Sequence, residues 1–172
     1  MPRVSTKDNK TVYQQIREEK ELTREKASEL LEFISPERLE RIESRKFNPQ
    51  PDEILAMAEK YQAPELCNYY CANECAIGQR YVPEVKVKDL SGIILELLAS
   101  LNSMQKRQER MIEITSDGNI QDEELADFIS IQKELERISV AVETLQLWVE
   151  RKLADGSIDQ DEYNSMKEKS NL

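Results

Sequence analysis

The chain has 172 residues, of which 34% are charged, 6% are aromatic and only four are glycine. This composition favours long solvated helices, and the length suits one large domain or one small domain with an appendage. No apolar run reaches membrane-spanning length and the start does not resemble a signal peptide, so we expect a cytoplasmic protein with no membrane partner. The net charge of −10 argues against general binding of polyanions.

The acidic surplus lies in the second part of the chain. Residues 1–62 hold 12 lysines and arginines against 13 aspartates and glutamates, whereas residues 63–172 hold 12 against 21. The first part is therefore nearly neutral.

Apolar spacing and capping residues predict helices throughout this first part. Val12 and Ile16 lie on one face of a first helix. Thr23 is suited to cap a second helix, because its hydroxyl accepts a free backbone N–H. Ser35 followed by Pro36 is typical of the start of a third helix, where the missing N–H of proline costs nothing.

A fourth and a fifth helix complete the region. Asp52 can cap the fourth helix. The inner face of that helix is predicted to consist of Ile54, Leu55, Ala58 and Tyr61. A short fifth helix follows Pro64 and carries the cysteines, and Gly78 ends the region. We therefore expect a domain over residues 1–78 and a linker over residues 79–87.

The pattern of residues 88–172 predicts a long antiparallel helical hairpin, similar to a coiled coil, and a short terminal helix. Apolar residues alternate between spacings of three and four, which keeps one seam turned towards a partner helix. The two series are Leu90, Ile94, Leu97, Leu101, Met104 and Met111, interrupted only by Gln108, and Phe128, Ile131, Leu135, Ile138, Val142, Leu145 and Val149. Further apolar residues beside each seam, such as Leu98, exceed what one hairpin partner covers. We therefore predict a homodimer through residues 88–154.

Two stretches, "SDGNIQDEE" and "ADGSIDQDE", share a pattern with calcium-binding EF-hand loops. The first two ligand positions hold Glu113 and Thr115 in one copy, and Arg151 and Leu153 in the other. Arginine and leucine offer no oxygen to a hard cation, so calcium binding is not expected. The glycines and acidic residues suit helix corners instead.

Cys67, Cys71 and Cys75 are spaced four residues apart, which would place them along one helical stripe. Three thiolates could bind zinc or an iron–sulfur cluster, but zinc normally takes four ligands and the chain has no histidine. We favour reduced cysteines packed as small apolar side chains, with a metal or redox role as the alternative. No metal and no cofactor is therefore expected.

The sequence contains no catalytic constellation. Without histidine or a glycine-rich phosphate loop, acid–base or phosphoryl chemistry would rest on carboxylates typical of solvated helix faces. An enzyme is not predicted.

The stretches "IREEKELT" and "SPERLERIES", with the "FNP" that follows, carry a resemblance to a known family. Over residues 10–65 the chain resembles the lambda-repressor/Cro (Xre) type of helix-turn-helix domain. The resemblance implies that Arg17 of the first helix pairs with Glu43 at the end of the third. It also implies that Leu39 and Ile42 seat the third helix on the core.

The chain departs from this family at two glycines. Glu32 and Phe33 replace the tight glycine between the second and third helices, and Arg45 replaces the glycine that usually ends the third helix. The stretch from Thr23 to Ser35 is also one residue longer than usual. These departures bear on the angle at which the third helix is held.

The side of the third helix opposite its core residues presents Glu37, Arg41 and Ser44. Arginine can donate two hydrogen bonds to guanine, and glutamate can accept one from the amino group of cytosine. Few basic residues are placed to meet phosphates and nearby acids oppose them, so we expect specific, salt-sensitive binding with little non-specific affinity.

Together these patterns predict an all-α protein with a five-helix helix-turn-helix domain, a long helical hairpin and a short terminal helix. The resemblance implies a sequence-specific transcriptional regulator of bacterial or phage type that binds double-stranded DNA as a dimer. The alternative is a protein-interaction module that keeps the fold without contacting DNA. The residues expected at the DNA are Arg24, Ser35, Glu37, Arg38, Arg41, Ser44, Arg45 and Lys46.

Overall fold

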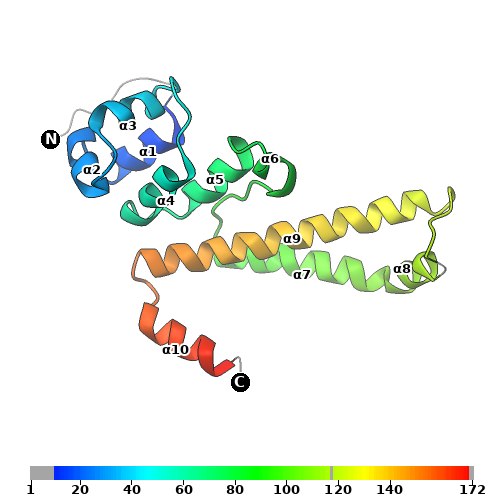
Figure 1. Cartoon of the computed structure of the whole chain (residues 1–172). Coiled ribbons are helices and arrows are strands. Elements are labelled where there is room, and N and C mark those ends of the chain that lie inside the picture. The colour runs from blue at the N-terminus through cyan, green and yellow to red at the C-terminus, as the bar shows by residue number, and fades with distance from the viewer. Residues whose placement is uncertain (1–9, 117, 171–172) are drawn as a thin grey trace. The chain divides into compact units, whose positions relative to one another are not determined.

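The computed structural model describes residues 10–116 and 118–170, which form ten helices and no strand. The predicted all-α fold is therefore confirmed (Figure 1). By internal contacts the chain divides into two compact units, Met1–Glu84 with Glu150–Leu172, and Val85–Val149. This division groups the last residues with the first unit, whereas the sequence predicts one region from residue 88 onwards. Within the described residues, no helix has the length and apolarity needed to cross a membrane.

The first unit begins with five helices around one core. They are α1 (Val12–Glu19), α2 (Arg24–Leu31), α3 (Pro36–Glu43), α4 (Pro51–Lys60) and α5 (Glu65–Asn73), and the short α6 (Gly78–Tyr81) follows. Thr23 and Ser35 cap α2 and α3 as predicted. The predicted cap of α4 is wrong: the cap is Gln50 and not Asp52, because Pro51 already occupies the first helical position.

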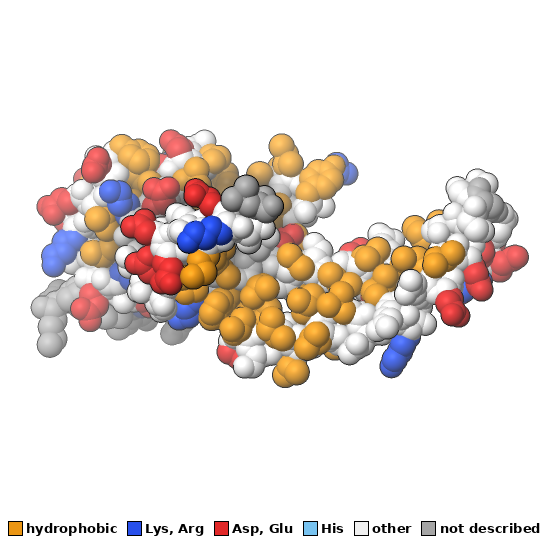
Figure 2. Space-filling model, turned by 90° about the horizontal axis from the view of Figure 1, so that it is seen from below, with side chains coloured by type: hydrophobic (Ala, Val, Ile, Leu, Met, Phe, Trp, Pro, Cys, Tyr) orange, Lys and Arg blue, Asp and Glu red, His pale blue; other side chains and the backbone are white. Residues whose placement is uncertain are grey.

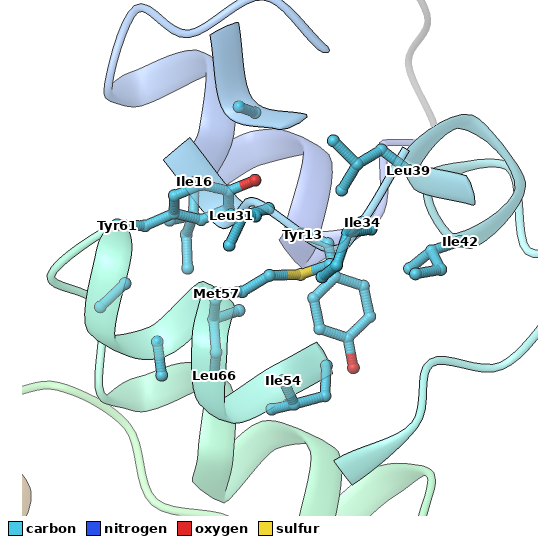
Figure 3. Close-up of a cluster of buried hydrophobic side chains, with 13 residues drawn as sticks. Tyr13, Ile16, Leu31, Ile34, Leu39, Ile42, Ile54, Met57, Tyr61 and Leu66 are labelled. Carbon is cyan, nitrogen blue, oxygen red and sulfur yellow. The ribbon is translucent and has the colours of Figure 1, made fainter. Parts of the chain in front are cut away.

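The core of the first unit contains thirteen buried side chains from α1 to α5 and the turns between them (Figure 3). Leu39 and Ile42 are both buried, which confirms that they seat α3. Leu55, predicted on the inner face of α4, is 55% exposed, and Met57 is buried in its place. The inner face of α4 follows the helical spacing from Ile54 to Met57 and onwards, which turns Leu55 to the outside.

Three helices of the first unit end in the same left-handed turn without a glycine. Glu21, Arg45 and Gln62 follow α1, α3 and α4 with φ values of 56°, 57° and 53°. After each, an N–H bonds back to the carbonyl five residues earlier, as Lys46 does to Arg41 at 2.9 Å. This is the Schellman arrangement. Arg45 thus adopts the backbone conformation that a glycine would take at the end of α3.

The turn between α2 and α3 contains a fourth left-handed residue. Glu32 has φ 64° and ψ −48°, and the N–H of Phe33 donates to the carbonyl of Leu31 at 2.7 Å. The three residues form a γ-turn with positive φ, which is rare and strained. The connection therefore stays tight where the family usually has glycine, and it leaves Phe33 61% exposed.

The second unit is the predicted antiparallel hairpin (Figure 1). Its helices are α7 (Leu90–Lys106), α8 (Gln108–Thr115) and most of α9 (Leu125–Ala154). The terminal helix α10 (Gln160–Ser170) is grouped with the first unit. The guanidinium of Arg107 bonds the hydroxyl of Ser130, and Arg110 Nε lies 2.8 Å from Asp127 Oδ2. These contacts join the first arm to α9 in antiparallel order.

The first arm of the hairpin is not one continuous helix. It breaks at Arg107, between α7 and α8, beside the polar Gln108 that interrupts the apolar series. The side chain of Arg107 turns to Ser130 instead of solvent. The interruption of the apolar series at Gln108 therefore coincides with a break in the helix.

Most residues of the predicted seam are partly buried, and the fully buried residues along the two arms are largely others. They are Ile93, Ser100, Ile114, Ile131, Glu134, Ala141, Thr144 and Leu147. Of this set only Ile131 belongs to the predicted series. The buried stripe is therefore turned away from the predicted seam.

Four residues of the predicted seam lie on the outside of the hairpin. Leu90, Leu101, Leu135 and Val142 are 39%, 45%, 50% and 40% exposed. By helical periodicity they fall on one side of the buried stripe, on both arms. We call this side the outer apolar face. Figure 2 shows hydrophobic side chains running along the long helices.

The opposite side of the hairpin is charged. It carries a cavity of about 600 Å³ between α7 and α9. The cavity is lined by Glu96, Ala99, Ser100, Lys133, Glu136, Arg137 and Val140. The hairpin therefore has one apolar side and one polar side.

We expect Gln62→Gly to raise the free energy of unfolding by about 0.5–1 kcal/mol, because glycine adopts a positive φ without steric cost. Gln62 is exposed and has φ 53°, so the substitution removes strain without opening the core. Urea unfolding of the full chain measures the change. Gln62→Ala is the matched control, since it keeps the Cβ atom and should give no gain. Equal midpoints for the glycine variant and the natural chain would contradict the expectation.

Candidate nucleic-acid interface

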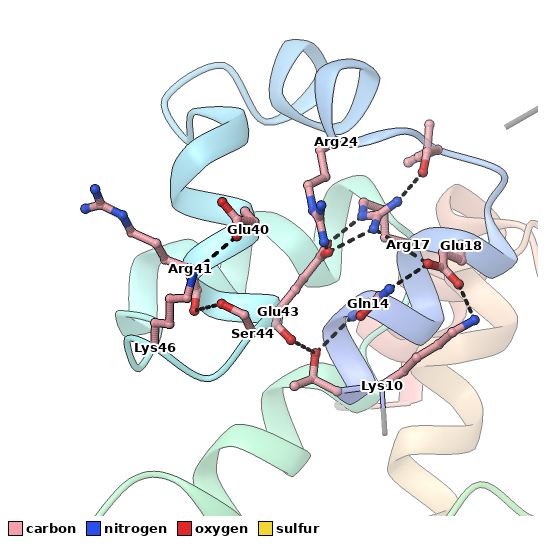
Figure 4. Close-up of polar contacts among 12 residues, drawn as sticks. Lys10, Gln14, Arg17, Glu18, Arg24, Glu40, Arg41, Glu43, Ser44 and Lys46 are labelled. Atoms are coloured by element: carbon pink, nitrogen blue, oxygen red, sulfur yellow. Dashed lines mark hydrogen bonds and ion pairs between the residues drawn. The ribbon is translucent and has the colours of Figure 1, made fainter. Parts of the chain in front are cut away.

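A buried ion pair fixes α3 against α1 (Figure 4). Arg17 Nε and Nη2 lie 2.5 and 2.9 Å from the two carboxylate oxygens of Glu43. The pairing implied by the sequence resemblance is therefore confirmed. Arg17 also donates to the carbonyl of Leu22 at 2.5 Å, which ties the turn before α2 to the same guanidinium. Burial alone would lower the pKa of Arg17, but the hydrogen bonds and charge of Glu43 outweigh it, and the pKa is raised.

Arg24, expected at the DNA, joins this ion pair. Its Nε donates to Glu43 Oε2 at 2.9 Å, so one carboxylate serves two guanidinium groups. Because only Nε of Arg24 is engaged among the described residues, its remaining N–H groups can still meet a phosphate.

Arg38, also expected at the DNA, is engaged within the domain. Its Nε and Nη2 lie 2.6 and 2.7 Å from the carboxylate oxygens of Glu53, and Nη2 donates to the carbonyl of Asn48 at 3.1 Å. Burial alone would raise the pKa of Glu53, but Arg38 and the N–H of Gln50 lower it. Arg38 thus joins α3 to α4 and to the loop between them.

The other expected residues lie on the outside of α3 and its end. Ser35, Glu37, Arg41, Ser44, Arg45 and Lys46 are all exposed. The Ser35 hydroxyl accepts the N–H of Arg38, and the Ser44 hydroxyl donates to the carbonyl of Arg41, so both have local partners. Lys46 Nζ lies 3.3 Å from Glu40 in an exposed pair, which constrains it little.

Arg41 is the arginine of α3 whose guanidinium is free to bind a ligand. It projects away from the helix (Figure 4) and makes no side-chain hydrogen bond or ion pair within the described residues. Glu37 lies one turn before it and has a lowered pKa, caused by its own backbone N–H, the Ser35 hydroxyl and the charge of Arg41. The outer side of α3 therefore presents a free donor fork beside an ionised acceptor.

Phe47 is a residue of this surface that the sequence reasoning missed. Its ring centroid lies 5.6 Å from Cζ of Arg41 and 6.0 Å from Cζ of Arg38, and the side chain is 54% exposed. The signal in the sequence was an aromatic residue placed just after the helix that carries both arginines. Both guanidinium groups thus lie within range of a cation–π interaction with the ring.

Residues 14–65 match the Helix-turn-helix family model. The helix-turn-helix segment is of the lambda-repressor/Cro (Xre) type, which confirms the resemblance stated for residues 10–65. The match covers α1 to the start of α5, and that family consists of DNA-binding regulatory domains, not enzymes. The match therefore supports a DNA-binding regulator in general. The chain has no significant match among curated proteins or solved structures.

The three cysteines follow the matched segment in the sequence. Cys67 and Cys71 belong to α5, but Cys75 lies beyond its end, so the predicted single helical stripe is wrong for the third thiol. All three are free and half-buried, and burial raises the pKa of the Cys67 thiol. The N–H of Gly78 donates to Cys75 Sγ at 3.4 Å. Over residues 10–116 and 118–170, no three cysteine, aspartate or glutamate side chains gather as a metal site.

We expect Arg38→Ala to lower the free energy of unfolding by about 1–3 kcal/mol, because it leaves the buried carboxylate of Glu53 without its charged partner. Arg41→Ala, on the same helix, is the matched control and should change it by less than about 0.5 kcal/mol. Urea unfolding at neutral pH measures both. Equal losses would show that Arg38 has no structural role beyond that of Arg41.

The ion pair between Arg38 and Glu53 also predicts that the stability of the domain depends on pH. The pKa of Glu53 is lowered from 4.5, so the stability it contributes is present above pH 4.5 and is lost as the pH falls through its folded pKa. Arg38→Ala should lack this part of the acid-induced loss. Unfolding free energies of the two proteins should therefore converge as the pH is lowered below 4.5. A constant difference across the acid range would contradict this origin.

Proposed function

We propose that the protein is a sequence-specific transcriptional regulator of bacterial or phage type, which acts in the cytoplasm and binds double-stranded DNA as a homodimer. The observation that carries the proposal is the free guanidinium of Arg41 on the outer side of α3, in a segment that matches the helix-turn-helix family. The second helix of such a motif commonly lies in the major groove, with its outer side towards the bases.

The exposed residues divide into two roles. Arg41 would donate two hydrogen bonds to a guanine, and Glu37 would accept one from the amino group of a cytosine. Arg24, Arg45 and Lys46 would meet phosphates. Arg38 is left out of this set, because its hydrogen bonds to Glu53 and Asn48 are used in the fold. With so few phosphate contacts, affinity should rest mainly on the bases and non-specific binding should be weak.

The alternative is a protein-interaction module, and the exposed acids on α3 favour it. Glu37 and Glu40 stand beside the few cations of this surface and repel phosphates. The exposed Phe33 in the adjacent turn offers an apolar contact to a protein partner.

Dimerisation is supported by the outer apolar face of the hairpin. This face exposes Leu90 and Leu101 on the first arm, and Leu135 and Val142, seven residues apart, on α9. Such an apolar surface suits packing against further helices. It is bordered by exposed uncharged residues, namely Ser91, Asn102 and Gln105 on α7 and Gln132, Ser139 and Gln146 on α9. Two copies of a chain with net charge −10 repel each other, and an uncharged border lets them meet without like charges in contact. A second copy is therefore the partner that fits.

We expect selection from random duplexes at low salt to enrich one sequence in two half-sites, with centres about 34 Å or a multiple apart. Arg41→Ala should cost about 1–3 kcal/mol of binding and relax the preference at one base pair. Lys46→Ala, the matched control, should weaken all sequences alike. If no sequence is enriched, the interaction module is the better description.

We expect light scattering to give a dimer mass at micromolar concentration. Leu101→Glu should yield monomers, because it places a charge in the outer apolar face. Ala99→Glu adds the same charge on the polar side of the same helix and should leave the dimer intact. A monomer mass for the natural chain, or an unchanged mass for Leu101→Glu, would rule out this interface.

A further inference from the structure

We propose that Phe47 is a positioning residue for base recognition, whose ring holds the guanidinium of Arg41 in place before DNA arrives. The inference rests on the proposed function and adds to it a residue outside the recognition helix. It follows from the way the chain turns back at the end of α3.

The left-handed turn at Arg45 returns the chain over its own helix. Lys46 and Phe47 both direct their N–H groups to the carbonyl of Arg41, at 2.9 and 3.3 Å. Phe47 is thereby bonded, through its backbone, to the residue whose side chain its ring contacts. The ring centroid lies 5.6 Å from Cζ of Arg41, within the range of a cation–π interaction.

The ring also lies near a second guanidinium, which the fold holds in place. Arg38 lies 6.0 Å from the same ring centroid, and its guanidinium is fixed by Glu53. Arg38 also bonds the carbonyl of Asn48, the residue directly after Phe47. Of the two guanidinium groups at the ring, that of Arg38 is therefore fixed by the fold, and that of Arg41 is held by the ring.

This contact leaves Arg41 able to read a base. A guanidinium stacked on an aromatic ring uses its flat face, and its N–H edge stays free for the two acceptors of guanine. An arginine that is ordered before binding loses less side-chain freedom when DNA binds. The strength of an exposed cation–π contact corresponds to a gain in affinity of about two- to fivefold.

The test uses the full chain and the sequence that it selects. Affinities are measured for the natural chain, Phe47→Leu, Arg41→Ala and the double variant, on the selected duplex and on duplexes changed at each base pair in turn. Phe47→Leu should weaken binding about two- to fivefold. It should relax the preference at the base pair affected by Arg41→Ala, and have no effect once Arg41 is absent. Phe47→Tyr, which keeps an aromatic ring, should restore binding.

Phe33→Leu is the matched control. Phe33 is an exposed phenylalanine of the same unit, and no guanidinium lies over its ring in the described part of the chain. It should change neither affinity nor base preference. In the free protein, the NMR signal of the Arg41 Nε–H should become more mobile in Phe47→Leu and stay unchanged in Phe33→Leu.

The outcomes separate the two proposals. If the natural chain enriches no sequence, both the regulator and the positioning role are overturned. If it binds its sequence but Phe47→Leu weakens binding equally with and without Arg41, Phe47 contacts DNA by itself and the positioning role alone is overturned. The same conclusion follows if Arg41 is equally mobile with and without the ring.

Discussion

The arrangement of the helix-turn-helix segment depends on the carboxylate of Glu43, buried at the end of α3. It binds Arg17 from α1 and Arg24 from the start of α2, and so joins three helices at one point. A buried carboxylate without these partners would be costly, so the helices are held in the one arrangement that satisfies it. This contact sets the direction of α3 from its inner end, while the outer side of the helix stays exposed.

Arginines on one helix face can have different roles, and the fold decides which. Arg38 and Arg41 stand one turn apart on α3 and look equivalent in the sequence. Glu53 is placed by the start of α4 to take the first, whereas nothing of opposite charge in the described residues takes the second. Phe47 then lies beside both. The outer surface of α3 thus combines Arg38, which is held by Glu53, with Arg41, which has no ion-pair partner among the described residues, and the ring of Phe47.

Most helices of the first unit could be predicted, because capping and helical spacing depend on residues that are close in the sequence. The Arg17–Glu43 pairing was implied by the family resemblance. The Arg38–Glu53 pair and the Phe47 contact could not be predicted, since both depend on how α4 and the loop after α3 are placed in space. In the hairpin, the seven-residue pattern predicted two paired arms but not their contact stripe. Several of the buried residues, such as Ser100 and Ala141, are small and carry little weight in a hydrophobic pattern.

The left-handed backbone at Arg45 places two demands on one residue. The turn favours glycine, which would relieve strain at φ 57°, whereas a surface that meets phosphates favours a cation. Arg45→Gly would make the domain more resistant to unfolding and, under the proposed function, would weaken its binding to phosphates. Stability and DNA affinity thus favour different residues at this one position.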